Sequence, residues 1–254
     1  MPQSIKDKIQ NIDNQTGIFT SAGIQTLNDA NNGSLVNMDF FPVTISQMPN
    51  KPNGQVYTQK ELFNYIRTHI NDFFDNLSFT PVNYSQYNIN DAQLWQSNNP
   101  FGAILSINIF PDEGSVVCSD FDNLTGEWIF TTIKAPWDGS HPVGGNRVFG
   151  YYTDVNGNMV IYTRGVDRYT LGSSTLGIGG IAVEMASQEI AFGKADEKWR
   201  NFQNKIKNFV NNGQQQPSNN GQSVVNTPVK YRPNWNKVKA VLNGTRPMSD
   251  LGCN

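Results

Sequence analysis

The chain has 254 residues, of which 37% are hydrophobic, so it is long enough to bury the core of one large domain or of two small ones. Its formal net charge of −2 comes from only 16% charged residues, which excludes the basic field that attracts nucleic acid or an anionic membrane surface. No stretch holds enough consecutive apolar residues to span a membrane.

The N-terminal segment has no apolar run that would form the core of a cleavable signal peptide. We therefore expect a cytoplasmic protein, or one that leaves the cytoplasm by a route that does not read a Sec signal. Ile5, Ile9 and Ile12 follow helical spacing, whereas residues 38–45 predict a short strand that Pro42 interrupts or confines to an edge. We assign residues 1–57 to an irregular or helical N-terminal segment.

The clearest predicted helix begins at Thr58. Thr58 and Glu61 have the spacing of a capping box, in which each side chain satisfies an otherwise unpaired backbone N–H. Apolar residues then recur at steps of three and four, at Leu62, Ile66, Ile70, Phe73 and Leu77. This stripe is expected to pack on a sheet or on another helix, and His69 beside it is expected to be structural.

Five short runs of β-branched and aromatic residues follow, and Gly, Pro and Asn separate them. They cover residues 102–109, 115–121, 126–134, 147–153 and 159–164. Because the connections are short, these strands are predicted to form an antiparallel meander. Asn156 and Gly157 give the strongest hairpin signal, since both tolerate the backbone angles of a tight turn.

A second helical region is predicted from Ile181 to about Asn211, with a break or kink at Gly193. The apolar residues Ala195, Trp199, Phe202, Ile206 and Phe209 lie on one face of it. We therefore predict an α+β fold in residues 58–212, with a central antiparallel meander of about five strands packed by two amphipathic helices. Residues 213–223 predict a flexible linker, and the tail of residues 224–254 either docks on the body or engages a partner.

The segment of residues 137–168 concentrates side chains suited to acid–base chemistry or anion binding. The candidate catalytic residues are His141, Arg147, Arg164 and Asp167. Imidazole titrates near neutral pH, and guanidinium groups hold phosphates and carboxylates. The alternatives are that the histidine caps a turn and that the arginines and the aspartate clamp the loop to the sheet through bidentate hydrogen bonds.

Six further residues are candidate ligand-binding residues. Gly144, Gly145 and Asn146 would form a turn whose backbone N–H groups hold an anion, with Arg147 directly after it, although these glycines also suit an ordinary turn. Arg168, at the end of the hairpin, would hold a phosphate or carboxylate of a ligand beside His141, unless it clamps the loop to the sheet. Trp128 and Trp137 would stack on a glycan, unless the helices bury them.

No metal site or cofactor is predicted. Two histidines and two cysteines are scattered over the chain without the spacing of a zinc site. The acidic residues Asp112, Glu113, Asp120 and Asp122 lack the pattern of a calcium-binding loop. Cys118 is expected to be a buried, unreactive thiol.

Three stretches resemble a poorly characterised bacterial segment of secreted or polymorphic-toxin type. They are residues 141–151 (HPVGGNRVFGY), 159–168 (MVIYTRGVDR) and 195–212 (ADEKWRNFQNKIKNFVNN), together less than a third of the chain. The resemblance implies a bacterial effector that is exported without a Sec signal and acts on or binds a target in another cell. It also implies a protein partner or a secretion apparatus.

Two other functions are compatible with these residues. The first is a non-enzymatic module that binds a glycan or a protein through aromatic residues of the sheet. The second is a hydrolase or transferase built around His141, Arg147 and Arg164. Convergence of these side chains in one concave pocket would favour the enzyme, and their dispersal would argue against it.

Overall fold

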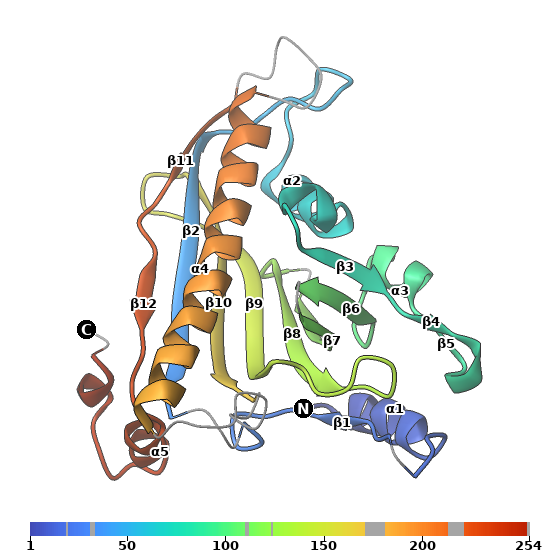
Figure 1. Ribbon diagram of the computed structural model, residues 1–254. Helices are drawn as coiled ribbons and strands as arrows, with labels where there is room; N and C mark the ends of the chain where they lie inside the picture. The colour runs from blue at the N-terminus through green and yellow to red at the C-terminus, as the bar shows by residue number, and fades with distance from the viewer. Residues whose placement is uncertain are drawn as a thin grey trace.

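The computed structural model describes residues 1–18, 20–30, 34–109, 112–122, 124–170, 181–212 and 221–252. These residues form an α+β structure around a ten-stranded antiparallel sheet (Figure 1). Eight strands follow the order β11-β2-β10-β9-β8-β7-β6-β3, while β1 pairs with β8 and β12 pairs with β2. The predicted class is confirmed, but the sheet is larger than the five strands predicted.

The strands of the large sheet are β1 (Gly23–Ile24), β2 (Val36–Gln47), β3 (Ser78–Pro81), β6 (Ile104–Ile109), β7 (Asp112–Asp122), β8 (Glu127–Lys134), β9 (Val143–Thr153), β10 (Met159–Tyr169), β11 (Gln222–Val225) and β12 (Val229–Tyr231). A separate two-stranded sheet holds β4 (Asn83–Tyr84) and β5 (Ile89–Asn90). The α-helices are α1 (Gln3–Asp13), α2 (Gln59–Thr68), α3 (Ala92–Gln96), α4 (Ile181–Asn212) and α5 (Trp235–Leu242).

The predicted meander corresponds to β6 through β10, which pair in chain order. At the β9–β10 turn the N–H of Asp154 donates to the carbonyl of Asn158 at 2.9 Å, and Gly157 has φ of 83°. Both strands are longer than predicted: β9 begins at Val143, and β10 continues to Tyr169. Residues 143–146, where the sequence predicts the Gly144–Asn146 turn, are therefore part of the sheet.

Strand β2 lies inside the sheet although it contains Pro42. It pairs with β10 on one side and with β11 and β12 on the other. The Pro42 carbonyl accepts from the backbone N–H of Asn226, which lies between β11 and β12. In an extended strand the nitrogen and carbonyl of one residue point to the same side. The nitrogen of Pro42, which has no N–H, therefore also points to the side of β11 and β12, at the gap between these two strands. The sheet therefore accommodates proline without losing a hydrogen bond to β10.

The capping box at the start of α2 is confirmed. The N–H of Glu61 donates to the Thr58 hydroxyl at 3.2 Å, and the N–H of Thr58 donates to the Glu61 carboxylate at 2.9 Å. The α-helix ends at Thr68, and the apolar stripe continues through a 3₁₀ helix, Ile70–Phe73. His69 stacks on Tyr65 with ring centroids 4.1 Å apart, as a structural histidine would.

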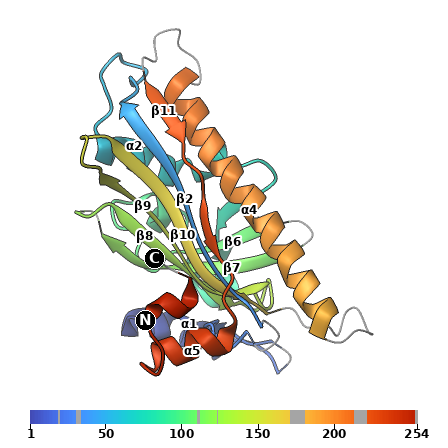
Figure 2. The same cartoon turned by 90° about the vertical axis from the view of Figure 1, so that its left-hand side faces the viewer.

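Helix α4 runs along one face of the sheet (Figure 2). The expected break at Gly193 is wrong, because the helix is continuous from Ile181 to Asn212. A glycine inside a helix costs only about 1 kcal/mol relative to alanine, and the burial of Phe202, Ile206 and Val210 against the core outweighs that cost.

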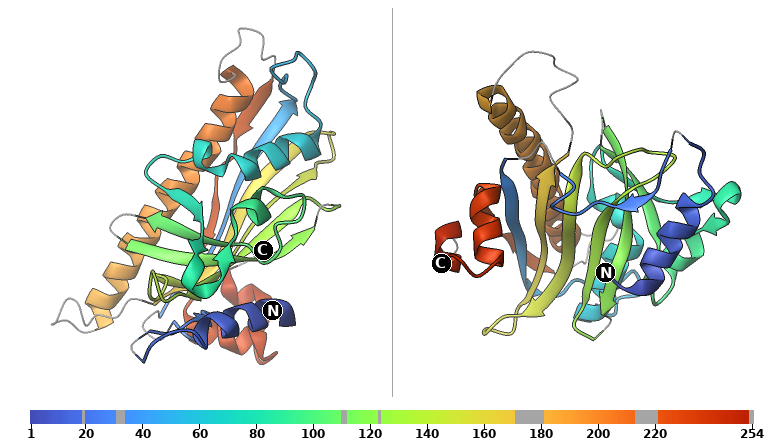
Figure 3. Two further views of the ribbon diagram at one scale, coloured as in Figure 1. Left: turned by 90° about the vertical axis from the view of Figure 1, so that its right-hand side faces the viewer. Right: turned by 90° about the horizontal axis from the view of Figure 1, so that it is seen from below.

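The main core lies between this face of the sheet and helices α2 and α4, and it includes Cys118, which is buried as expected. Burial raises the pKa of the Cys118 thiol to about 12, so the thiol is unreactive. Helix α1 packs on a second cluster that includes Val117 and Ile133. Helices α1 and α5 lie at the same end of the molecule (Figures 2 and 3).

The C-terminal tail docks on the body. Strands β11 and β12 extend the sheet beside β2, and Val238 of α5 packs against Val36. Most of the predicted linker, residues 213–220, lies outside the described residues. In the part of the chain that is described, no helix combines the length and apolar composition needed to cross a membrane.

Candidate functional site

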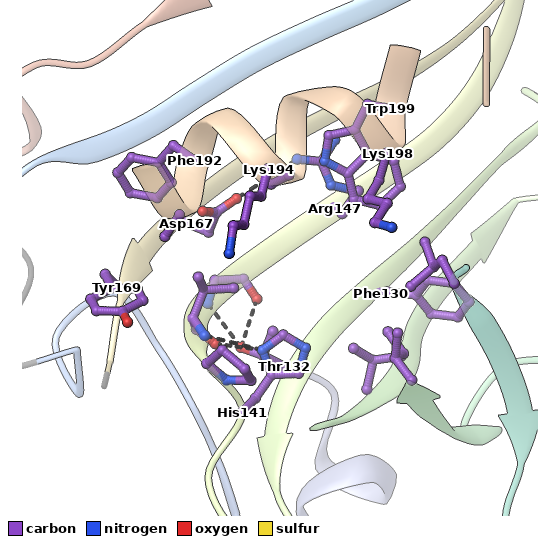
Figure 4. Close-up of a pocket in the computed structure, with 18 of the residues that line it drawn as sticks. Phe130, Thr132, His141, Arg147, Asp167, Tyr169, Phe192, Lys194, Lys198 and Trp199 are labelled. Carbon is purple, nitrogen blue, oxygen red and sulfur yellow. Dashed lines mark hydrogen bonds and ion pairs between the residues drawn. The ribbon is translucent and has the colours of Figure 1, made fainter. Parts of the chain in front are cut away.

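A cavity of about 640 Å³ lies between α4 and the sheet (Figure 4). We call it the α4 cavity. Its sheet wall carries mainly apolar side chains, including Ile107, Val116, Phe130 and Phe149. Its helix wall includes Phe192, Ala195 and Trp199. A limited set of polar residues interrupts this lining, and four of them are the sequence candidates His141, Asn146, Arg147 and Asp167. The candidate Gly145 lines the cavity as well.

Arg147 joins the polar residues of the sheet wall into one cluster. Its guanidinium group donates two hydrogen bonds to Asp39, at 2.9 and 2.7 Å, and lies 3.7 Å from a carboxylate oxygen of Asp167. The side chain of Asp39 is completely buried, and the guanidinium also lies 3.9 Å from the ring centroid of Trp199. Gly165 leaves the room for this guanidinium, because a Cβ there would collide with it. Contacts within the protein therefore hold this cluster together.

Asp167 is a buried carboxyl group of this cluster whose pKa is raised. Burial raises its pKa to about 6, and the nearby charge of Asp39 adds to this, while Arg147 and a hydrogen bond from Asn37 oppose it. The same Asn37 amide also donates to Asp39 at 2.8 Å. Asp167 thus titrates close to neutral pH on the wall of the cavity.

His141 is buried, with 4% of its surface exposed. Its backbone N–H donates to the Gln25 side chain at 2.6 Å, and its carbonyl accepts from the same side chain at 3.1 Å. The imidazole packs over Gly114, where a Cβ would collide with it. Burial lowers the pKa of His141 to about 4, so the ring is neutral and weakly basic at pH 7. A general base works best with a pKa near the working pH, so the proposed catalytic role loses support.

Arg164 does not join the other three candidates. Strand residues alternate between faces, so Arg164 points to the opposite side of the sheet from Gly165 and Asp167. There its guanidinium group lies 3.2 Å from Glu127, and 53% of its side chain is exposed. The expectation that all four candidate catalytic residues converge is therefore wrong.

The proposed anion-binding turn is also wrong. Gly144, Gly145 and Asn146 belong to β9 and pair with Arg168, Asp167 and Val166 of β10. Their backbone groups therefore belong to the sheet and form no turn. A Cβ at Gly145 would collide with the Val166 carbonyl, and one at Gly144 with the Thr26 carbonyl. These glycines permit close packing of backbone segments.

The remaining ligand-binding candidates lie elsewhere. Arg168 is on the opposite face, with its guanidinium 4.3 Å from the ring centroid of Trp235. Trp128 is completely buried and stacks on Phe149, so it cannot stack on a glycan. Trp137 is partly buried, stacks on Tyr84 with ring centroids 4.7 Å apart, and is absent from the lining of the α4 cavity.

Sequence reasoning missed Asp39, Lys194 and Lys198. Asp39 had a detectable signal, since it is the single acidic residue in the apolar run of residues 38–45 and such a residue requires a buried partner. The two lysines are four residues apart, so they lie on the same face of α4. The sequence does not show that this face lines a cavity, because that depends on how α4 packs on the sheet. Within the described ranges, no group of three or more His, Cys, Asp or Glu side chains is arranged to hold a metal ion.

The sequence matches no protein-family model and no curated protein sequence. Solved structures that align with the chain include an uncharacterized protein from Bacillus thuringiensis, with 10% identity and a TM-score of 0.35 over 64% of this chain and 96% of that chain. A point mutant of norcoclaurine synthase from Thalictrum flavum, in complex with a transition state analogue, aligns with 14% identity and a TM-score of 0.33 over 65% of this chain and 98% of that chain. With identities and TM-scores this low, the function has to be inferred from the cavity itself.

Proposed function

We propose that this protein binds a small, largely apolar molecule in the α4 cavity. The observation that carries this proposal is the volume of about 640 Å³ between α4 and the sheet, lined mostly by aliphatic and aromatic side chains. Pockets for small organic ligands span roughly 300 to 1,000 Å³ and combine such a lining with a few placed polar groups. The α4 cavity has both properties.

Binding explains the site better than hydrolysis or group transfer. The Thr132 hydroxyl lines the cavity, but it already donates to the backbone and accepts the N–H of Gly145 at 2.9 Å. His141 is a weak base, and the guanidinium group of Arg147 is engaged by Asp39 through two hydrogen bonds. An activated nucleophile needs an adjacent base that is itself oriented by a third group, and these described residues do not form that arrangement.

A cavity-filling substitution tests this proposal with a neutral fluorescent probe, N-phenyl-1-naphthylamine. The wild-type protein is expected to bind one probe molecule with enhanced fluorescence. Ala195→Trp places an indole at the helix wall. The indole takes up volume that the probe needs, so the probe affinity is expected to fall about tenfold or more, which corresponds to about 1.4 kcal/mol.

Asn208→Trp is the matched control, because it adds the same indole to an exposed position of α4. It is expected to leave both stoichiometry and affinity unchanged. Equal binding by the wild type and Ala195→Trp, or the absence of saturable binding to the wild type, would contradict a ligand site in this cavity. Thermal unfolding of each variant checks that the fold is retained.

We also propose that this binding belongs to a bacterial effector that is exported without a Sec signal and acts on a target in another cell, with a protein partner or a secretion apparatus. The resemblance of residues 141–151, 159–168 and 195–212 to secreted bacterial proteins supports this proposal. Expression inside bacterial and eukaryotic cells is expected to slow the growth of at least one of them, and Ala195→Trp is expected to relieve the effect. Unimpaired growth in both cell types would count against an effector.

A further inference from the structure

Two lysines of α4 face the cavity. In Figure 4 the side chain of Lys194 leaves the helix toward the wall formed by Thr132 and His141, and that of Lys198 extends toward Phe130. Residues four apart lie on the same face of a helix, so the two ammonium groups flank one region of the cavity. They bring two positive charges to a mainly apolar space.

Neither lysine makes an ion pair with another described residue. The ammonium of Lys198 donates only to the Asn76 carbonyl, at 3.3 Å, among the hydrogen bonds of the described chain. Other lysines near this helix are paired: Lys205 lies 2.7 Å from Asp75, and Lys230 lies 2.8 Å from Asp196. The charge of Lys198 also acts on Asp75, but Lys205 holds that carboxylate, so among the described residues neither cavity lysine has a carboxylate of its own within ion-pair distance.

The other charged residues of the lining are accounted for. Arg147 is neutralised by its two hydrogen bonds to Asp39, and Asp167 lies beside Arg147. Glu197 lies between the two lysines in sequence, is exposed, and pairs with neither of them among the described ion pairs. With two lysines against one glutamate, the helix wall carries a net positive charge opposite the mainly apolar side chains of the sheet wall.

We propose that the ligand is a small organic anion whose carboxylate or similar group lies between Lys194 and Lys198 and whose apolar body packs on Phe130 and Phe149. This rests on the proposed binding function and names its ligand class. The ammonium groups donate charge-assisted hydrogen bonds to the anion, which favour a charged head group over a neutral one of the same chain length. The aromatic sheet wall takes up the hydrocarbon part.

Decanoate and 1-decanol have the same chain length but differ in the charge of the head group. Comparing them separates the contribution of the lysines from that of the apolar wall. Calorimetric titration is expected to show saturable binding of both to the wild type at low salt. In Lys194→Gln/Lys198→Gln the affinity for decanoate is expected to fall about tenfold, since each partly exposed ion pair contributes modestly. The affinity for 1-decanol is expected to stay within about twofold, and raised salt is expected to weaken only decanoate binding to the wild type.

Arg200→Gln/Lys207→Gln is the matched control, because it removes the same charge from exposed positions of α4 outside the cavity lining. It is expected to leave decanoate binding unchanged. If both double variants lose the same decanoate affinity, or if neither loses any, Lys194 and Lys198 do not bind the anion. Binding of 1-decanol would then still support a ligand site in the cavity. Failure of both ligands to bind the wild type counts against the cavity itself.

Discussion

Replacing Arg147 with methionine is expected to lower the free energy of unfolding by about 3–5 kcal/mol. The substitution removes two hydrogen bonds and the positive charge from Asp39, whose side chain has no exposed surface. Asp167 loses the same partner at 3.7 Å. Methionine keeps most of the packing against Trp199. The loss of stability therefore measures the cost of leaving the Asp39 and Asp167 carboxylates without their positive partner. Urea unfolding at pH 7 measures it.

Arg164→Met is the matched control on the neighbouring strand. Arg164 also pairs with a carboxylate, that of Glu127, but 53% of its side chain is exposed, and exposed pairs contribute about 0–1 kcal/mol. The double variant Arg147→Met/Asp39→Leu is expected to recover part of the stability, because it removes the buried charge along with its partner. Similar losses in Arg147→Met and Arg164→Met would show that Asp39 is not dependent on Arg147.

The elements with short-range signals are the ones that sequence predicts well. The capping box at Thr58 and the Asp154–Asn158 turn each need only a few neighbouring residues, and both appear in the structure. The sequence predicts too short a strand at β2, because Pro42 fits inside the sheet only beside the interruption between β11 and β12, which lies far along the chain. Propensity cannot supply that context.

For the candidate site, too, the sequence predicts some features well and others poorly. His141, Arg147 and Asp167 were identified because charged and imidazole groups stand out in a β-rich segment, and they do line one cavity. The sequence predicts a turn at Gly145, where the structure has a close backbone contact, because glycine permits both and the sequence alone does not distinguish them. Arg164 was misplaced because the strand continues to Tyr169, and its alternation decides which face each side chain takes.

Asp167→Asn is expected to stabilise the protein at pH 7.5 by about 2–3 kcal/mol, with the gain vanishing below about pH 4. The folded pKa of about 6 is above the ordinary 3.8, so the folded state binds this proton more tightly than the unfolded state, and stability falls as pH rises from 4 through 6. The new amide removes that loss and can donate to Asn37 Oδ1, a buried oxygen that has no hydrogen-bond partner among the described residues.

Urea unfolding of both proteins from pH 4 to pH 8 tests the sign of this prediction. Asp154→Asn is an opposite-sign control, because hydrogen bonds from the Asn158 side chain and from backbone N–H groups lower the pKa of Asp154 in the β9–β10 turn. Its replacement is expected to lower stability above pH 4, where the ionised carboxylate accepts those bonds. A pH-independent difference for Asp167→Asn, or destabilisation at pH 7.5, would mean that Arg147 and Asn37 stabilise the carboxylate more than burial disfavours it.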